Sequence, residues 1–139
     1  MCTSLLELPW RGESACVRID LRQKLITVKM YDRNGTYSAG ELSRNVEIPL
    51  TDEQAEQFLA ALDESSFWIR SYWEPCQRSG TVLDDGTQSI LEGVDQGHYH
   101  MIIRRDPIDS QVLAVFELVW EWAGLGQGLG RAWARVWRC

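Results

Sequence analysis

The chain has 139 residues, of which 45% are hydrophobic and 24% are charged, and this composition predicts one globular domain with an apolar core. It excludes a collagen-like repeat, a disordered chain and a small disulfide-dependent scaffold. The 14 basic and 20 acidic residues give a net charge of −6, whereas nucleic-acid-binding domains usually carry the opposite sign. We therefore expect no nucleic-acid partner.

The start of the chain predicts a cytoplasmic protein. It lacks a basic region followed by an apolar run, so it does not resemble a secretory signal. The longest apolar stretch, 112–125, contains two glutamates and is shorter than the roughly 20 residues that span a membrane. The four cysteines show no paired spacing, which favours reduced thiols: Cys2, Cys16, Cys76 and Cys139.

The first half of the chain predicts strands followed by a helix. Residues 16–22 and 25–33 alternate between apolar and polar side chains, as in half-buried strands. Asn34-Gly35 is typical of a tight hairpin turn, and residues 40–45 are expected to form a loop or bulge. Residues 46–50 predict a strand, in which Pro49 indicates either a sheet edge or a strand end. Thr51 and Gln54 then form a capping-box pattern, and an apolar stripe follows at helical spacing: Ala55, Phe58, Leu59 and Leu62.

The second half predicts a hairpin and a second helix. Residues 88–94 and 98–105 are two strands, which we expect to be joined by the three-residue loop 95–97. Residues 112–123 form a broadly apolar helix. The element order β-β-β-α-β-β-α predicts an α+β domain over residues 1–125, with an antiparallel sheet of about five strands and both helices on one face. Residues 126–139 are expected to be a glycine-hinged tail rich in arginine and tryptophan.

The first predicted helix is strongly acidic, with no basic residue between its carboxylates: Asp52, Glu53, Glu56, Asp63 and Glu64. Such a run is typical of a solvated helix face. It is also what a surface that steers a basic protein partner requires. The aromatic stretch that follows also has a structural and a functional interpretation. In the structural one, Trp68 and Trp73 are core residues. In the functional one, Trp68, Tyr72 and Trp73 are anchors for a partner.

The predicted hairpin brings together the one cluster of titratable groups: Glu92, His98, His100 and Arg104. A three-residue loop places Glu92 opposite His100 and directs Tyr99, Met101 and Ile103 into the core. A two-residue loop would instead place Glu92 opposite Met101. The favoured interpretation is a cross-strand polar network that fixes the register. A zinc site or an acid–base pair is the alternative. No nucleophile or phosphate-binding motif accompanies the cluster, so we expect no metal, cofactor or catalytic residue.

Several positions carry a resemblance to a group of small uncharacterised bacterial proteins with a DGTxW…EG…GxYH…RxxP pattern. The matches are 85–87, Glu92-Gly93, Gly97, Tyr99-His100, Arg104 and Pro107. The resemblance covers about residues 16–125. Ser89 stands where the group usually has tryptophan, and Arg105 where it has another aromatic residue, so a surface built on those side chains is altered here. The resemblance implies a compact α+β domain with no established chemistry.

In general character the group is similar to immunity proteins, which neutralise bacterial toxins. The first hypothesis is therefore a non-enzymatic immunity protein that binds a toxin, often a basic nuclease, through its acidic and aromatic residues. The second is a small enzyme, metal-dependent or acid–base, that uses Glu92, His98 and His100. The third is a structural or assembly subunit that forms homo-oligomers, for instance a homodimer.

Overall fold

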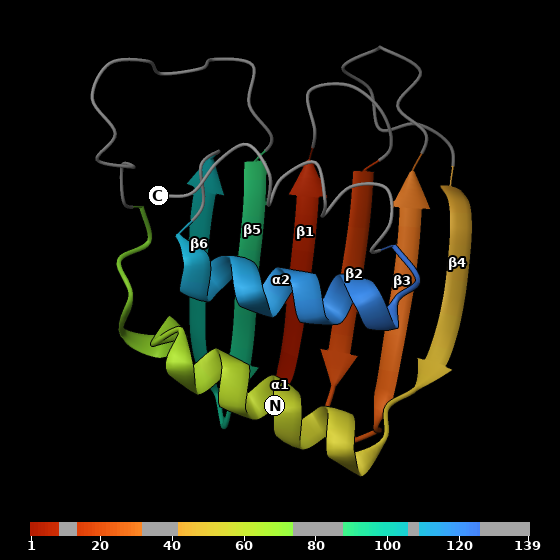
Figure 1. Cartoon of the computed structure of the whole chain (residues 1–139), viewed down its shortest axis with the longest axis horizontal. Helices are drawn as coiled ribbons and strands as arrows, with labels where there is room; N and C mark the ends of the chain where they lie inside the picture. Colours follow the sequence, from red (N-terminus) through yellow and green to blue (C-terminus); the bar gives the residue numbers. More distant parts are fainter. Residues whose placement is uncertain (9–13, 32–41, 74–87, 106–108, 126–139) are drawn as a thin grey trace.

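The computed structural model describes residues 1–8, 14–31, 42–73, 88–105 and 109–125, and these form an α+β fold with one six-stranded sheet (Figure 1). The strands lie in the order β4-β3-β2-β1-β5-β6, and every neighbouring pair is antiparallel. The elements are β1 Cys2–Leu8, β2 Ser14–Asp20, β3 Leu25–Tyr31, β4 Leu42–Pro49, α1 Asp52–Glu64, η1 Phe67–Ile69, β5 Gln88–Asp95, β6 His98–Arg105 and α2 Ser110–Trp122. The predicted fold class is confirmed.

Strand β1 was not expected from the sequence, which predicted about five strands, whereas the sheet has six. This strand lies in the centre of the sheet, paired with β2 on one side and β5 on the other. Its sequence, CTSLLEL, does not alternate clearly between apolar and polar residues. Its conformation is therefore stabilised by the two neighbouring strands, which bond to both of its edges, rather than by a local pattern.

Both helices cover the same face of the sheet, and the core lies between the two layers (Figure 1). One row of the sheet passes through all six strands in register, from β4 to β6: Val46, Val28, Val17, Leu5, Leu91 and Ile102. The α1 helix adds the buried side chains of Phe58 and Leu62 to the core. The second helix contributes the larger share: Val112, Leu113, Val115, Phe116, Val119 and Trp120.

The helix ends follow local chemistry. The capping box of α1 is confirmed, because the Gln54 amide donates to the Thr51 hydroxyl at 3.1 Å and the Thr51 amide donates to the Gln54 side chain at 3.0 Å. The α2 helix begins before the predicted residue 112, because the Asp109 carboxylate caps it by accepting from the Val112 amide at 3.1 Å. Leu59, predicted on the buried stripe of α1, is instead 45% exposed, so that stripe is narrower than expected.

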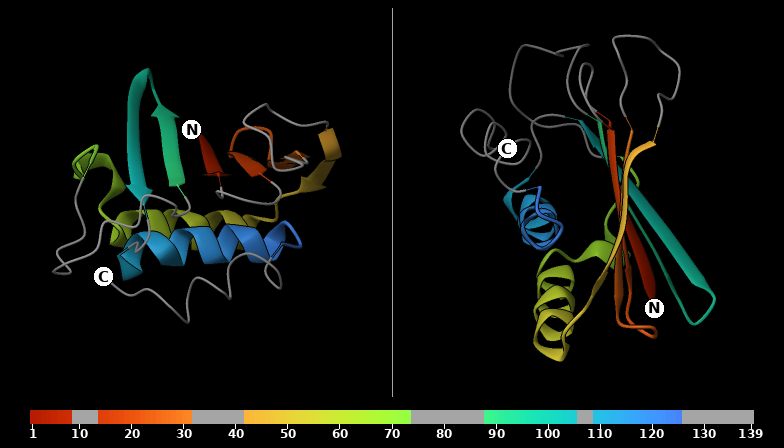
Figure 2. Two further views of the ribbon diagram at one scale, coloured as in Figure 1. Left: turned by 90° about the horizontal axis from the view of Figure 1, so that it is seen from above. Right: turned by 90° about the vertical axis from the view of Figure 1, so that its right-hand side faces the viewer.

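The opposite face of the sheet is covered by no helix or strand of the described part of the chain. Seen edge-on, the two helices lie on one side only, and the β5–β6 hairpin leans out on the other side, away from them (Figure 2). The two described helices are also too short or too polar to cross a bilayer. Antiparallel sheets tolerate such an arrangement because one face can meet solvent.

Some predicted features lie outside the described residues or at positions other than those expected. The expected Asn34-Gly35 turn and the tail 126–139 lie outside the described residues, as do Cys76 and Cys139. The strand β4 begins at Leu42, inside the segment expected to be a loop or bulge, and the β3–β4 register shifts between Met30 and Tyr31. The irregularity predicted for residues 40–45 is therefore a shift in register near the start of β4, and it does not prevent the strand from forming.

Candidate functional site

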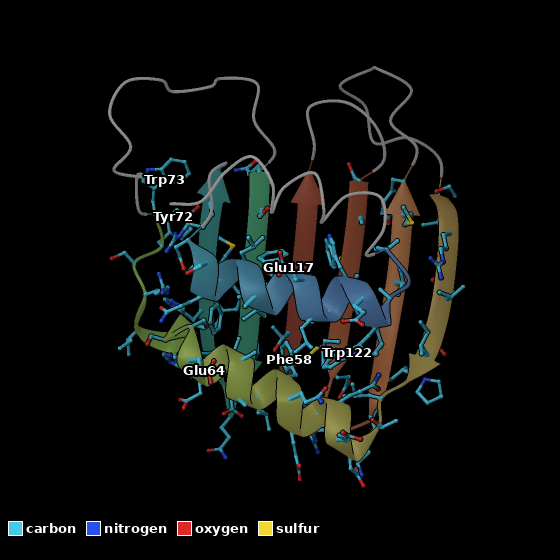
Figure 3. All side chains as sticks on the ribbon, viewed as in Figure 1. Phe58, Glu64, Tyr72, Trp73, Glu117 and Trp122 are labelled. Carbon is cyan, nitrogen blue, oxygen red and sulfur yellow. The ribbon has the colours of Figure 1, made fainter. Side chains whose placement is uncertain are left out.

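The outer surface of the helices is acidic. All five carboxylates predicted on α1 are exposed, because Phe58 and Leu62 occupy the side that meets the sheet. Glu117 and Glu121 extend the same charge onto α2, which packs beside α1, and neither helix contains a lysine or arginine (Figure 3). We call these residues the acidic helix layer: Asp52, Glu53, Glu56, Asp63, Glu64, Glu117 and Glu121.

One carboxylate of the acidic helix layer is already paired. Asp52 accepts a charge-assisted hydrogen bond from Lys24, which lies in the turn between β2 and β3. Both side chains are well exposed, so solvent screens this ion pair and it adds little to stability. No ion pair involving the other six residues of the layer is seen among the described residues.

An apolar segment continues directly from the carboxyl end of α1. Ser66 adopts a left-handed conformation with φ 55°, which turns the chain out of the helix and into η1. Ile69 is then 87% exposed, Tyr72 53% and Trp73 46%. Two of the three predicted anchors, Tyr72 and Trp73, are thus on the surface, and the interpretation of Trp73 as a core residue is wrong. Ile69, which sequence analysis did not single out, is the most exposed of them all.

Trp68, the third predicted anchor, turns inward. Its ring packs edge-on against the buried Phe67 ring, with a centroid distance of 4.8 Å. It also lies 5.6 Å from the His98 ring and 6.5 Å from the His100 ring. The residue is half-buried, so it supports the segment from below while its neighbours face solvent.

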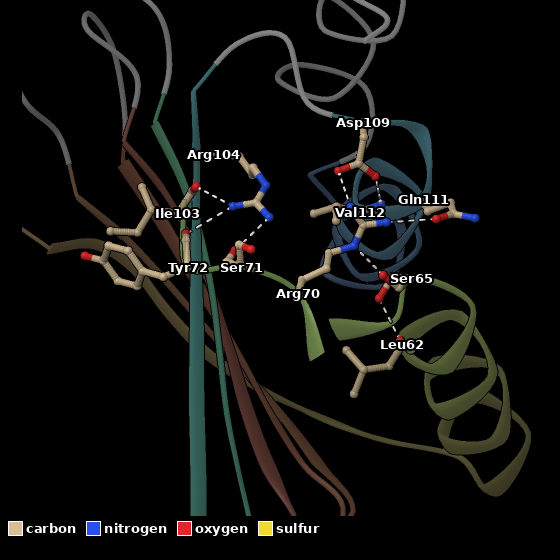
Figure 4. A network of polar contacts seen from close by, with 10 residues as sticks. All are labelled: Leu62, Ser65, Arg70, Ser71, Tyr72, Ile103, Arg104, Asp109, Gln111 and Val112. Atoms are coloured by element: carbon tan, nitrogen blue, oxygen red, sulfur yellow. Dashed lines mark hydrogen bonds and ion pairs between the residues drawn. The ribbon is translucent and has the colours of Figure 1, made fainter. Parts of the chain in front are cut away.

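Two arginines hold this segment in place (Figure 4). The Arg70 guanidinium joins three elements: it donates to the Ser65 carbonyl at the end of α1, to the Asp109 carboxylate at 3.0 Å and to the Gln111 side chain at 2.8 Å. The Arg104 guanidinium, on β6, donates to carbonyl oxygens of the segment itself. Because arginine presents several donors in a rigid fork, the exposed apolar side chains stand on a fixed backbone.

The Arg104 contacts show why the segment follows β6. Its Nη2 donates to the Ser71 carbonyl at 3.0 Å, and its Nη1 donates to the Tyr72 carbonyl at 3.1 Å. The Ile103 amide donates to the same Tyr72 oxygen at 2.9 Å, next to a parallel bridge between Trp73 and Ile103. The segment thus pairs with part of the β6 edge, and sequence spacing alone gave no sign of this contact.

The predicted register of the β5–β6 hairpin is wrong. Asp95 pairs with His98 across a two-residue turn, so Glu92 lies opposite Met101 and His100 lies opposite Gly93. The two turn residues have φ values of 48° and 79°, the positive pair that a type I′ turn requires and that matches the twist of the strands. The predicted three-residue loop would have needed a positive φ at its last residue only.

This register separates the predicted polar network. His98, His100 and Arg104 share the helix-facing side of β6, whereas Glu92 faces the uncovered side. There Glu92 accepts a hydrogen bond from the Tyr99 hydroxyl at 3.1 Å. Tyr99, Met101 and Ile103, predicted in the core, belong to the uncovered face as well. Partial burial and this hydrogen bond raise the pKa of the Tyr99 phenol.

The two histidines lie apart from Glu92 and contact other groups. The His100 Nε2 lies 2.9 Å from the Arg70 carbonyl oxygen, a hydrogen bond in which the ring nitrogen donates. Glu92, the carboxylate that the enzyme hypothesis assigned to the histidines, lies on the other face of the hairpin. Within the described ranges, no three His, Cys, Asp or Glu side chains gather closely enough to hold a metal ion.

The two described cysteines, Cys2 and Cys16, are free. Both belong to the uncovered face, because their neighbours in β1 and β2 point toward the helices. Burial raises the pKa of the Cys16 thiol above its ordinary value, an effect that nearby Arg18 opposes. Such a thiol is a weak nucleophile at neutral pH.

No protein-family model matches the chain, and no curated protein sequence is similar to it.

Proposed function

We propose that this protein is a non-enzymatic binding module of the bacterial cytoplasm, an immunity protein that neutralises a toxin by direct contact. The observation that carries the proposal is the acidic helix layer together with the exposed Ile69, Tyr72 and Trp73, which follow α1 along the chain. Charged surfaces of one sign accelerate association with a partner of the opposite sign. Exposed aromatic side chains on a rigid backbone are typical binding hot spots.

The two parts of this surface have different roles. The carboxylates attract a basic protein over a distance of about one Debye length, roughly 8 Å at physiological salt. The apolar side chains then exclude water at the contact and slow dissociation. Because Arg70 ties the segment to both helices, little conformational entropy is lost on binding. A basic nuclease is the class of toxin that this chemistry fits.

The direct test uses the product of the adjacent gene, since toxins and their immunity proteins are expected to be encoded together. Expression of that product should arrest growth of a susceptible host, and co-expression of this chain should restore it. A toxic neighbour whose effect is unchanged by this chain, or a neighbour without toxicity, contradicts the proposal.

Matched variants then locate the contact on the purified pair. Reversing charge with Glu53→Lys and Glu56→Lys should lower the association rate constant about tenfold at low salt and remove most of its dependence on ionic strength. Glu47→Lys is the control, because Glu47 is an exposed carboxylate on β4, outside the acidic helix layer. Because the control reverses one charge and the test variant two, a loss half as large on a logarithmic scale from the control would show that only net charge matters.

A second pair of variants tests the apolar part. Ile69→Ser should raise the dissociation rate constant about tenfold or more, because the side chain is 87% exposed and lost contacts act mainly on dissociation. Leu42→Ser, at a 47% exposed leucine on β4, should have no effect. If both variants bind like the wild-type chain, the segment is not part of the interface.

A further inference from the structure

The uncovered face of the sheet carries one pair of opposite charges placed symmetrically about its central strand. On the central strand β1, Ser4 pairs with Arg18 of β2 on one side and with Glu92 of β5 on the other. Arg18 and Glu92 both belong to the uncovered face, because their strand neighbours are buried against the helices. A positive and a negative side chain therefore lie at equal distances on either side of β1.

We propose that two copies of this chain pack with their uncovered faces together, about a twofold axis that runs along β1. This rotation exchanges the two sides of the sheet, so it places Glu92 of the second copy over Arg18 of the first, and the reverse. Each dimer then contains the ion pair twice. Isologous contacts of this kind are the commonest way in which soluble proteins form dimers.

The apolar residues of the face follow the same rotation. Leu25 and Tyr99 lie two strands away from Cys2 on opposite sides, in one register row. In the next row Thr27 and Met101 flank Ser4 in the same way. The rotation therefore places Tyr99 opposite Leu25, and Met101 opposite Thr27. Tyr99 is 53% exposed, so its burial against Leu25 favours association, whereas Val94 comes to lie over Asp20 of the second copy.

Size and shape agree with a stable interface. An axis along β1 overlays five strands of each copy, because β4 has no counterpart beyond β6. Five strands about 4.8 Å apart, with seven residues at about 3.4 Å each, give a face of roughly 570 Å² per partner. The two faces together bury roughly 1,140 Å², which is above the ~1,000 Å² expected of a biological interface. The β5–β6 hairpin leans out on the uncovered side (Figure 2), and the rotation places it along β2 and β3 of the second copy. The acidic helix layers then face outward, so the dimer does not depend on the proposed function and leaves both toxin-binding surfaces free.

The first test measures mass in solution over a wide concentration range, by sedimentation velocity. The wild-type chain should show reversible formation of a species of twice the 16.0 kDa chain mass. Arg18→Glu should raise the dimer dissociation constant about tenfold or more, because it creates two like-charge contacts. The double variant Arg18→Glu, Glu92→Arg restores opposite charges and should recover dimerisation.

Arg22→Glu is the control, since Arg22 is an exposed arginine in the β2–β3 turn, outside the face. It should dimerise like the wild-type chain. A wild-type chain that stays monomeric at the highest concentration overturns the proposal, and so does a folded Arg18→Glu variant that dimerises normally. A charge-swapped variant that stays monomeric although it is folded overturns the assigned axis.

A second test is independent of charge and uses the cysteines. Cys2 lies on the proposed axis, so its two copies are separated only by the spacing of packed sheets, about 10 Å. The two copies of Cys16 are also displaced sideways by two strands, which gives roughly 14 Å. Relative to the rate at which each thiol reacts with a monofunctional maleimide, a chain that keeps only Cys2 should therefore cross-link faster with a short bis-maleimide than a chain that keeps only Cys16. Faster cross-linking of Cys16, or none at either position, overturns the proposal.

Discussion

Replacing Gly93 by alanine tests the packing that supports the exposed segment. Gly93 lies on the helix-facing side of β5, opposite His100. An added Cβ would stand 3.1 Å from Cε1 of Phe67 and 3.2 Å from Cη2 of Trp68. Both distances are below an ordinary van der Waals contact. The Phe67 ring is fully buried and packed against the Trp68 and His100 rings at 4.8 and 5.1 Å, so it has little room to move.

The expected change in the free energy of unfolding is the difference between two gains and one cost. Alanine gains about 0.8 kcal/mol from a buried methyl group and about 0.4–1 kcal/mol from the less flexible unfolded chain. Overpacking a well-filled core costs about 1–3 kcal/mol, and the enclosed Phe67 ring places this site near the upper end. We therefore expect Gly93→Ala to lower the free energy of unfolding by about 1 kcal/mol, measured by urea denaturation followed by tryptophan fluorescence.

A double-mutant cycle with Phe67→Leu identifies the cause. Leucine lacks the ring atoms that the new Cβ would meet, so Phe67→Leu should cost less in the Gly93→Ala background than in the wild-type chain, by about 0.5 kcal/mol or more. Gly97→Ala is the control: its Cβ meets nothing within 4 Å, but its φ of +79° is strained for alanine, and its loss of about 1 kcal/mol should not depend on Phe67. A Gly93→Ala variant as stable as the wild-type chain, or equal costs of Phe67→Leu in both backgrounds, would refute the argument.

Three further predictions concern single contacts. Thr51→Ala removes the acceptor of the α1 capping box and should lower the free energy of unfolding by about 1 kcal/mol in the same assay; no loss would show that the Gln54 side chain caps α1 alone. Arg70→Lys should cost about 2 kcal/mol, because lysine cannot bond Ser65, Asp109 and Gln111 together; a loss far below that of Arg70→Ala would mean that charge alone suffices. Because the pKa of Tyr99 is raised in the folded chain, its contribution to stability is present below about pH 10 and lost as the pH rises through the raised pKa. Glu92→Gln should lower that pKa in an absorbance titration, with Tyr99→Phe identifying the signal, and an unchanged midpoint would contradict the assigned hydrogen bond.

The sequence determined the elements whose cause is local. Thr51 and Gln54 specified the start of α1, the alternation of 16–22 and 25–33 specified two strands, and the broad apolar face of 112–123 specified a helix that packs on the sheet. In each case the deciding interaction joins residues within a few positions of one another. The acidic face of α1 could be predicted for the same reason, because exposed carboxylates alternate with the buried stripe at helical spacing.

Only the tertiary structure decided the features that depend on contacts between distant residues. The central strand β1 is stabilised by two strands that lie far from it in the sequence. The turn between β5 and β6 has two residues and not the three expected. Because side chains alternate with a period of two, this difference of one residue places Tyr99 and Met101 on the face opposite to the predicted one and separates Glu92 from His100. Ile69 is exposed because Arg70 and Arg104 hold its segment against the ends of the helices and the edge of β6, and contacts across 30 to 40 residues leave no periodic signal in the sequence.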